Sequence, residues 1–199
     1  MSTSAEVLST AEQLFLRYGL KSVSMDDIAN EAGISKKTLY QFVTSKAELV
    51  DQIVENHICQ ETNLMDELTG STENAIDEML AISATVSETL KHMSPGLMYD
   101  LRKYYRKTWD KINTLHRGHI YQVVIRNLER GRGEGLYRSD FDPTIVAQFY
   151  VIKAMSLIDE ELFPSDLFNK TELVRTHFIY HLAGILSNDG RDYLKHIPL

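Results

Sequence analysis

Proline, glycine and cysteine are scarce in this sequence. Its 199 residues include 10 glycines and 4 prolines, together about 7%, where an average chain has about 12%. So few chain-breaking residues indicate few turns and long elements. The single cysteine, Cys59, excludes an intramolecular disulfide and any multi-cysteine zinc or iron–sulfur site. Cys59 is expected to be buried in a helix rather than reactive.

Long apolar runs are lacking as well. The first ten residues hold no cationic patch followed by an apolar core, so no signal peptide is expected. The most apolar stretches, Ile145–Ile152 and Phe178–Leu186, are interrupted by polar residues. Neither approaches the ~18–20 apolar residues needed to span a bilayer. We therefore expect a cytoplasmic protein with no membrane partner, in a reducing compartment that suits one cysteine.

An excess of basic residues is also missing. The chain has 21 Lys+Arg against 28 Asp+Glu, a formal net charge of -7. This balance argues against a wholly basic protein that coats nucleic acid or an anionic membrane. Residues 1–46 are neutral overall, however, and residues 47–199 carry the whole acidic excess. Residues 32–47 contain three lysines and no acid, so a local basic tip stays compatible with DNA binding.

The sequence does have a helical spacing of apolar residues. Val7, Ala11, Leu14 and Phe15 recur at intervals of three and four residues, and similar stripes follow along the chain. Sustained alternation of apolar and polar residues, which is typical of strands, is scarce. We predict an all-α protein of about nine helices.

Several boundaries of the predicted helices can be placed from single residues. Ser45, followed three residues later by Glu48, fits a capping box at the start of a long helix. Asp142 before Pro143 fits a cap followed by proline in the first turn. The glycines within residues 131–135 are expected to form a turn between helices.

The segment Met25–Tyr40 reads as two short helices joined by a sharp turn. Ala29 is small enough for two helices to cross closely, and Gly33 suits the positive φ of a helix end. With Leu39 as an apolar contact, the spacing is that of a helix-turn-helix.

Serines precede both of these short helices. Ser24 is expected to cap the first helix, and Ser35 the second, which runs to about Phe42. The second helix would lie outward with its amino-terminal residues in a major groove. Lysine side chains there suit donation to guanine or neutralisation of phosphate. The alternative is a surface pair of helices with solvated lysines. The residues expected at the groove are Ser35, Lys36, Lys37 and Thr38.

Residues 7–50 resemble the amino-terminal domain of TetR-family transcriptional regulators. A second, weaker resemblance lies in residues 135–143, which resemble a turn that precedes the penultimate long helix of many members. The matching residues in the amino-terminal region are Ala11, Phe15, Tyr18-Gly19, Ser22 to Met25, Ile28-Ala29, Ala32 to Lys36, Thr38 to Tyr40, Ser45-Lys46 and Glu48-Leu49.

The resemblance implies a homodimer of all-α chains. Each chain would have a three-helix DNA-binding head, residues 1–46, and a larger helical body, residues 47–199, which binds a small effector and dimerises through its last two long helices. These helices are expected at about Thr144–Glu160 and Thr171–Ser187. Both carry more apolar residues than one face needs, which supports dimerisation. The implied partner is a double-stranded, pseudo-palindromic operator, and no cofactor is implied.

The family's DNA contacts fall on individual residues of this chain. Ser24, Tyr40 and Lys46 match phosphate-contacting positions. Lys36, Lys37 and Thr38 match positions that face the groove. The predicted DNA-binding residues are thus Ser24, Ser35, Lys36, Lys37, Thr38, Tyr40, Gln41 and Lys46.

Tyr105, Trp109 and Tyr150 are candidate effector-binding residues, because aromatic side chains in the middle of the body suit the walls of a pocket. Core packing is the alternative. Tyr105 and Trp109 lie in residues 102–117, which hold six bases and one acid. This segment could bind single-stranded nucleic acid, or it could be an amphipathic helix with a solvated basic face.

His177 and His181 are four residues apart on one predicted helix and could share a metal ion. No acidic residue accompanies them in a metalloprotease-like motif, so packing or a dimer interface is favoured, with no metal site and no enzymatic activity. We therefore predict a DNA-binding transcriptional regulator, a repressor released by a small effector. The alternatives are a DNA-binding adaptor without an effector and a helical metal-dependent enzyme.

Overall fold

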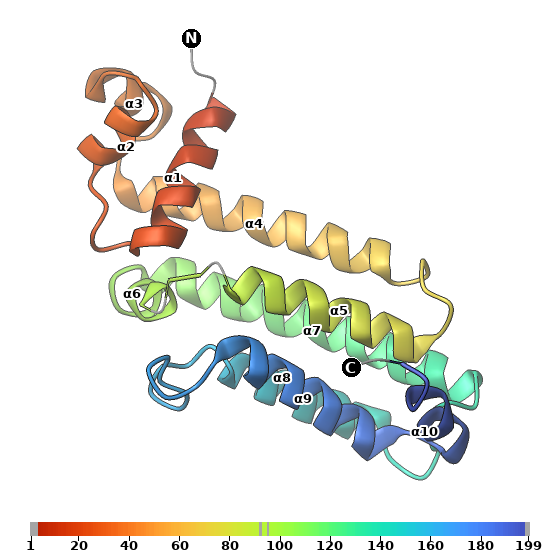
Figure 1. Ribbon diagram of the computed structural model, residues 1–199. Coiled ribbons are helices and arrows are strands. Elements are labelled where there is room, and N and C mark those ends of the chain that lie inside the picture. Colours follow the sequence, from red (N-terminus) through yellow and green to blue (C-terminus); the bar gives the residue numbers. More distant parts are fainter. Residues whose placement is uncertain (1–3, 92, 95, 198–199) are drawn as a thin grey trace. The chain divides into compact units, whose positions relative to one another are not determined.

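The computed structural model describes residues 4–91, 93–94 and 96–197, apart from the side chain of Leu115. Within these ranges the chain forms ten helices and no strand, which confirms the all-α prediction (Figure 1). The helices are α1 (Ser4–Tyr18), α2 (Met25–Glu31), α3 (Lys36–Phe42), α4 (Lys46–Leu68), α5 (Ala75–Lys91), α6 (Leu97–Tyr104), α7 (Arg106–Gly133), α8 (Pro143–Ser156), α9 (Lys170–Ile185) and α10 (Asn188–Leu194).

The chain divides into two compact units. The first unit comprises Met1–Glu61 and His92–Thr114, and the second comprises Thr62–Lys91 and Leu115–Leu199. Helices α4 and α7 each contribute residues to both units. These two units are defined by which residues pack together. The division into a head and a body after residue 46 concerns function and stays a prediction.

The core of the first unit forms from one apolar face of each helix in the head. The stripe predicted on α1 is buried at Val7, Ala11 and Phe15. Leu39 of α3 and Leu49 of α4 are fully buried in the same cluster. Burial of such side chains stabilises the fold by about 1.5–3 kcal/mol each, so α4 holds the three-helix segment in place.

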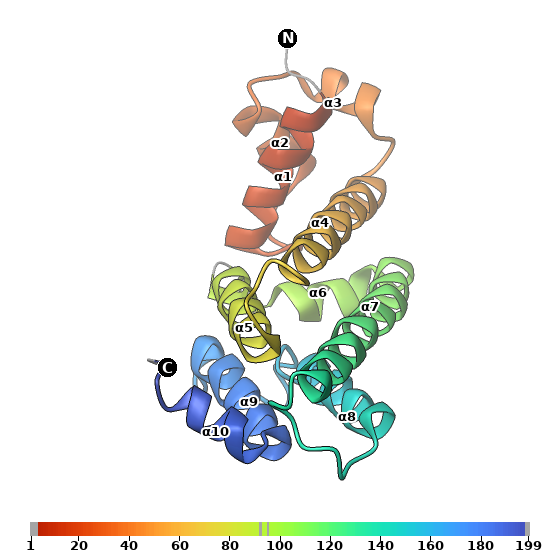
Figure 2. The same ribbon diagram turned by 90° about the vertical axis from the view of Figure 1, so that its right-hand side faces the viewer.

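The second unit has a separate apolar core. Helix α5 packs along α9, and α8 packs against α9 (Figures 1 and 2). Met79 of α5, Leu128 of α7 and Leu182 of α9 are fully buried in one cluster. This unit therefore has an apolar interior of its own.

Polar side chains brace one part of the second unit. The Tyr137 hydroxyl donates to the carbonyl of Ala75 at 3.0 Å and contacts Asn127 Oδ1 at 2.9 Å. Arg130 forms ion pairs with Glu78 at 2.8 Å and with Glu134 at 2.7 Å. Glu78 is completely buried, so Arg130 compensates a charge that would otherwise be costly inside the core.

The expected turn at residues 131–135 is partly wrong, because α7 continues to Gly133. Within residues 131–135, positive φ appears only at Gly135, at 75°. Gly131 instead serves close packing. A Cβ atom at this position would clash with Cδ2 of Tyr137, so the glycine gives the Tyr137 ring room to cross the helix.

The last long helices differ in length from their prediction. Asp142 caps α8 as expected, with its Oδ1 accepting from the Thr144 N–H at 2.8 Å. Helix α8 ends at Ser156, earlier than the expected Glu160, and α9 spans Lys170–Ile185. The expected burial of Cys59 is also wrong. Its side chain is exposed on α4, because the buried stripe of that helix passes through Ile53 and Ile58.

Candidate DNA-binding site

Helix α2 begins with the predicted serine cap. Ser24 Oγ accepts from the Asp27 N–H at 3.2 Å, and Asp27 Oδ2 accepts from the Ser24 N–H at 2.8 Å. Ser24 Oγ also donates to Asp27 Oδ2 at 2.7 Å. These hydrogen bonds from Ser24 lower the pKa of Asp27. Two local residues thus fix the start of α2 through a complete capping box.

The turn between α2 and α3 has the predicted helix-turn-helix chemistry. Gly33 adopts a φ of 65°, a left-handed conformation that glycine accepts without steric cost. The Ile34 N–H then returns to the Ala29 carbonyl at 3.0 Å. Ile28, Ala29 and Leu39 are buried between the elements, so the angle between α2 and α3 is set by packing.

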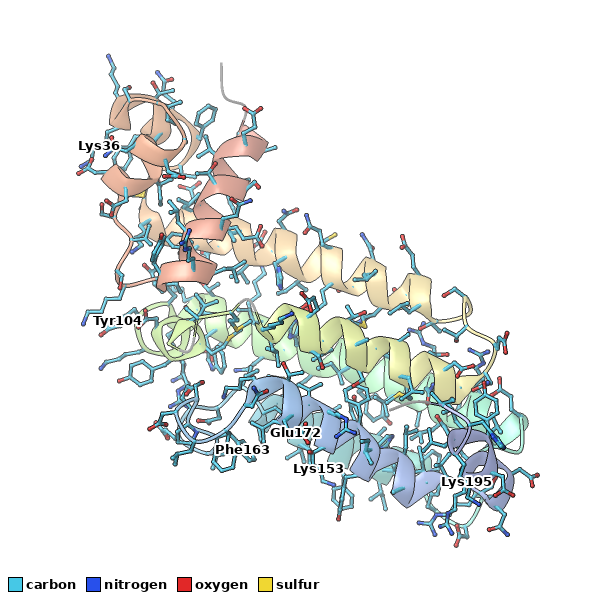
Figure 3. The ribbon with its side chains drawn as sticks, viewed as in Figure 1. Lys36, Tyr104, Lys153, Phe163, Glu172 and Lys195 are labelled. Atoms are coloured by element: carbon cyan, nitrogen blue, oxygen red, sulfur yellow. The ribbon has the colours of Figure 1, made fainter. Side chains whose placement is uncertain are left out.

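Helix α3 presents its predicted DNA-binding residues to solvent. Ser35 caps the helix by accepting from the Thr38 N–H at 3.0 Å, and its Oγ lies 2.8 Å from the Thr38 hydroxyl. Lys36 and Lys37 are exposed, and Lys36 extends away from the helix in Figure 3. The sequence therefore locates both the cap and the outward lysines of this helix. Tyr40 and Gln41 are exposed as well.

The local basic tip, residues 32–47, has an acidic neighbour from outside this range, namely Asp26. Lys36 Nζ lies 2.9 Å from Asp26 Oδ1, and both side chains are more than half exposed. The hydrogen bond to Asp26 raises the pKa of Lys36. Because Asp26 lies on α2, across the turn, the pairing depends on the fold. It partly neutralises the charge that α3 would offer to DNA.

Lys46 has a structural contact that sequence reasoning missed. Its ammonium group donates to the carbonyls of Leu20 and Val23 in the turn between α1 and α2, and it lies 5.5 Å from the centre of the Phe15 ring. Burial lowers the pKa of Lys46. The lysine thus ties the start of α4 to the turn before Ser24. Its predicted phosphate contact stays a prediction.

The capping box expected at Ser45 is formed only in part. Ser45 Oγ accepts from the Glu48 N–H at 3.2 Å, as predicted. The Glu48 carboxylate, however, accepts from the N–H and the hydroxyl of Thr44. Glu48 therefore binds Thr44, the residue before the cap, and this contact still helps to fix the start of α4.

Known proteins share both the segment and the fold. The family described as bacterial regulatory proteins, tetR family, matches residues 7–53. The transcriptional regulator YvaF of Bacillus subtilis is 22% identical, with 86% of this chain and 90% of YvaF covered. The transcriptional repressor KstR2 of Mycobacterium tuberculosis is 25% identical, with 74% and 76% covered. This chain belongs to the TetR family.

Two solved TetR-like structures extend the similarity over nearly the whole chain. The ketosteroid transcriptional regulator KstR2 of M. tuberculosis aligns with a TM-score of 0.64 at 20% identity, covering 94% of this chain and 96% of KstR2. The transcriptional regulator FadR of B. subtilis, in complex with stearoyl-CoA, aligns with a TM-score of 0.68 at 13% identity, covering 92% and 100%. This TetR-family chain is a DNA-binding transcriptional regulator.

The three candidate effector residues of this TetR-family chain lie in different units. Tyr105 and Trp109 pack against the core of the first unit. Tyr150 is buried in the core of the second. No site within a single unit therefore holds all three side chains among the described residues.

Tyr150 forms a cluster with the two histidines of α9. Its ring centre lies 4.6 Å from that of His177 and 4.7 Å from that of His181. Burial lowers the pKa of His177 to about 4 and that of His181 to about 3, so both imidazoles are neutral at pH 7. Among the described residues, neither histidine Nε2 has a hydrogen-bond partner. The spacing of the histidines is visible in the sequence, but their contact with Tyr150 is not.

Metal-binding clusters and membrane-spanning helices are both absent from the part of the chain that the structure describes. There, three or more His, Cys, Asp or Glu side chains nowhere come together to hold a metal ion. Among the same residues, no helix combines the length and the apolar character needed to cross a membrane.

Proposed function

We propose that this chain is a homodimeric TetR-family repressor that binds a pseudo-palindromic operator and is released by a small effector. One observation carries the DNA-binding part, namely the helix-turn-helix whose second helix, α3, is buried at Leu39 and exposed at Lys36 and Lys37. Helix α3 would enter the major groove, with the two α3 helices of a dimer about 34–36 Å apart.

The individual DNA contacts divide by chemistry. Lys36 and Lys37 at the start of α3 suit guanine edges, which lysine reads through O6 and N7. Ser24, Tyr40 and Lys46 suit phosphate oxygens, which position a protein without reading sequence. Ser35, Thr38 and Gln41 complete the proposed surface. To contact DNA, Lys36 must give up its ion pair with Asp26. Its contact therefore adds less binding free energy than that of Lys37.

An exposed apolar stripe supports dimerisation through α8. Ile145, Phe149 and Ile152 are 53%, 59% and 55% exposed, and their spacing of four and three residues places them on one face of the helix. Tyr180 of α9 is also exposed. We propose that a second copy of this chain packs against this exposed stripe. Other apolar residues of these helices, such as Phe178 and Leu182, are buried within the chain itself.

The second unit is the proposed effector site. KstR2 is named as a ketosteroid transcriptional regulator, and FadR binds stearoyl-CoA in its structure. In this chain the Tyr150, His177 and His181 cluster would offer neutral hydrogen-bonding groups to a largely apolar effector. Tyr105 and Trp109, the other two candidate effector residues, lie in the first unit and are not part of this cluster. An effector that weakens DNA binding must itself bind less tightly to the DNA-bound dimer.

Selection of bound DNA from a random pool tests the proposal. We expect enrichment of one site with two related half-sites of opposite orientation. Sedimentation should give a dimer for the wild type and a monomer for Ile152→Glu, while Gln60→Glu, an exposed site on α4, should leave the mass unchanged. A monomeric wild type at micromolar concentration, or a pool without enrichment, contradicts the proposal.

A further inference from the structure

A surface of lysines and tyrosines lies beside the proposed DNA-binding helices of the first unit. Lys21, in the turn between α1 and α2, places its Nζ 5.9 Å from the centre of the Tyr104 ring on α6. Lys103 Nζ lies 5.1 Å from the Tyr99 ring and 5.5 Å from the Tyr104 ring. We call these four residues the α6 surface.

All four side chains of the α6 surface are exposed. The two tyrosine rings, 41% and 48% exposed, sit among the exposed large apolar side chains of the chain. Contact between each ammonium group and a ring face restricts the lysine without neutralising its charge. The surface therefore presents two positive charges to solvent.

The hydrogen bonds inside the α6 surface leave it suited to an anion. Lys103 Nζ donates to the Tyr99 hydroxyl oxygen at 2.9 Å, so the Tyr99 proton points away from the lysine. The nearby Asp100 carboxylate accepts from the backbone N–H of Lys21 at 2.9 Å, and it is directed at the turn. Lysine ammonium and tyrosine hydroxyl groups are both common phosphate donors.

The α6 surface adjoins the proposed operator contacts. Lys21 precedes Ser24 by three residues, which span at most about 11 Å of chain. Lys36 of α3 and Tyr104 of α6 extend from the same side of the first unit in Figure 3. A duplex seated on α3 therefore carries its phosphates, spaced at one charge per ~1.7 Å of helix axis, past this side of the unit.

We infer that the α6 surface binds the phosphate backbone of DNA outside the operator half-site, so that the footprint extends beyond the base pairs read by α3. The inference rests on the proposed function, because it assumes that α3 lies in the major groove. Phosphate contacts of this kind add affinity and salt dependence without adding sequence preference.

Two duplexes test the inference. One ends at the limits of the selected operator, and the other carries about ten further base pairs on each side. The wild type should bind the long duplex more tightly, by about tenfold at 0.1 M salt, and with a steeper salt dependence. The double variant Lys21→Ala/Lys103→Ala should bind both duplexes equally, with its slope on the long duplex reduced by about 0.9 for each lost contact.

Matched variants separate local contact from overall charge. Lys91→Ala/Lys195→Ala removes two exposed lysines of the second unit and should keep the advantage of the long duplex. Lys21→Arg/Lys103→Arg should keep it as well. If Lys21→Ala/Lys103→Ala also keeps it, the inference is wrong while operator binding stands. If the wild type binds neither duplex, the proposed function and the inference both fall.

Discussion

The backbone N–H of Lys21 donates to the Asp100 carboxylate at 2.9 Å, across 79 residues of sequence. This bond ties the turn before α2 to α6. Gly19, at the start of the same turn, has a φ of 81°. The Lys46 ammonium group donates to two carbonyls of this turn, those of Leu20 and Val23. The position of the α2 cap therefore depends on residues outside the helix-turn-helix.

Asp100→Ala should weaken operator binding without removing a DNA contact. The lost hydrogen bond costs about 1 kcal/mol of stability, and the loosened turn no longer fixes Ser24. We expect a lower operator affinity with an unchanged salt slope, measured by titration of labelled DNA. Asp110→Ala, which breaks only the exposed pair with Arg106, should change neither. Equal effects of the two variants would contradict a role for Asp100 in positioning.

Lys46→Ala should destabilise the protein as well as weaken DNA binding. Two carbonyls lose their donor, at a cost of about 1–3 kcal/mol if they stay shielded from water. Thermal unfolding should shift to lower temperature. The matched variant Lys37→Ala, on the exposed side of α3, should reduce operator affinity with no thermal shift. If Lys46→Ala unfolds at the wild-type temperature, the contacts of Lys46 with the two carbonyls contribute little to stability.

Asp26→Asn should strengthen binding to non-operator DNA. The substitution releases Lys36 from its ion pair, so its charge becomes available to phosphate. We expect about twofold or greater tightening at low salt, which high salt should abolish. Glu31→Gln changes the net charge of the same segment equally and serves as the control. The expectation fails if both variants tighten binding to the same extent.

Gly131→Ala should lower the free energy of unfolding, although alanine favours helices. Overpacking against the Tyr137 ring costs about 1–3 kcal/mol, which exceeds the gain of about 1 kcal/mol in helix propensity. Gly118 lies in the same helix, and a Cβ atom added there would meet nothing within 4 Å. Gly118→Ala should therefore stabilise the protein in denaturant titration, and stabilisation by both variants would show that the Tyr137 ring moves aside.

The buried histidines should make stability depend on pH. Well above the ordinary histidine pKa of about 6.5, both imidazoles are neutral in the folded and the unfolded chain. As the pH falls toward 4, the unfolded chain takes up protons that His177 and His181 resist, because burial lowers their pKa values to about 4 and about 3. Stability should fall by up to about 1.4 kcal/mol per pH unit for each histidine. Denaturant midpoints between pH 6.5 and 5 should decline less for His177→Gln/His181→Gln than for the wild type.

The sequence predicts features that depend on near neighbours. Ser24, Ser35 and Asp142 cap their helices because capping needs only the next two or three residues. The contacts of Lys46 and Asp100 could not be predicted, since their partners are distant in sequence. The glycines of α7 suggested a turn, whereas packing against Tyr137 explains Gly131 better. The sequence also could not show that Tyr105 and Tyr150 lie in different units.

The capping box of α2 limits what Ser24 contributes to DNA binding. Its hydroxyl proton is already donated to Asp27 at 2.7 Å. A phosphate oxygen at Ser24 must therefore replace a carboxylate oxygen, and the number of hydrogen bonds stays the same. Such an exchange yields little net free energy. As a proposed phosphate contact, Ser24 would therefore help to set the register of the duplex and add little to the affinity.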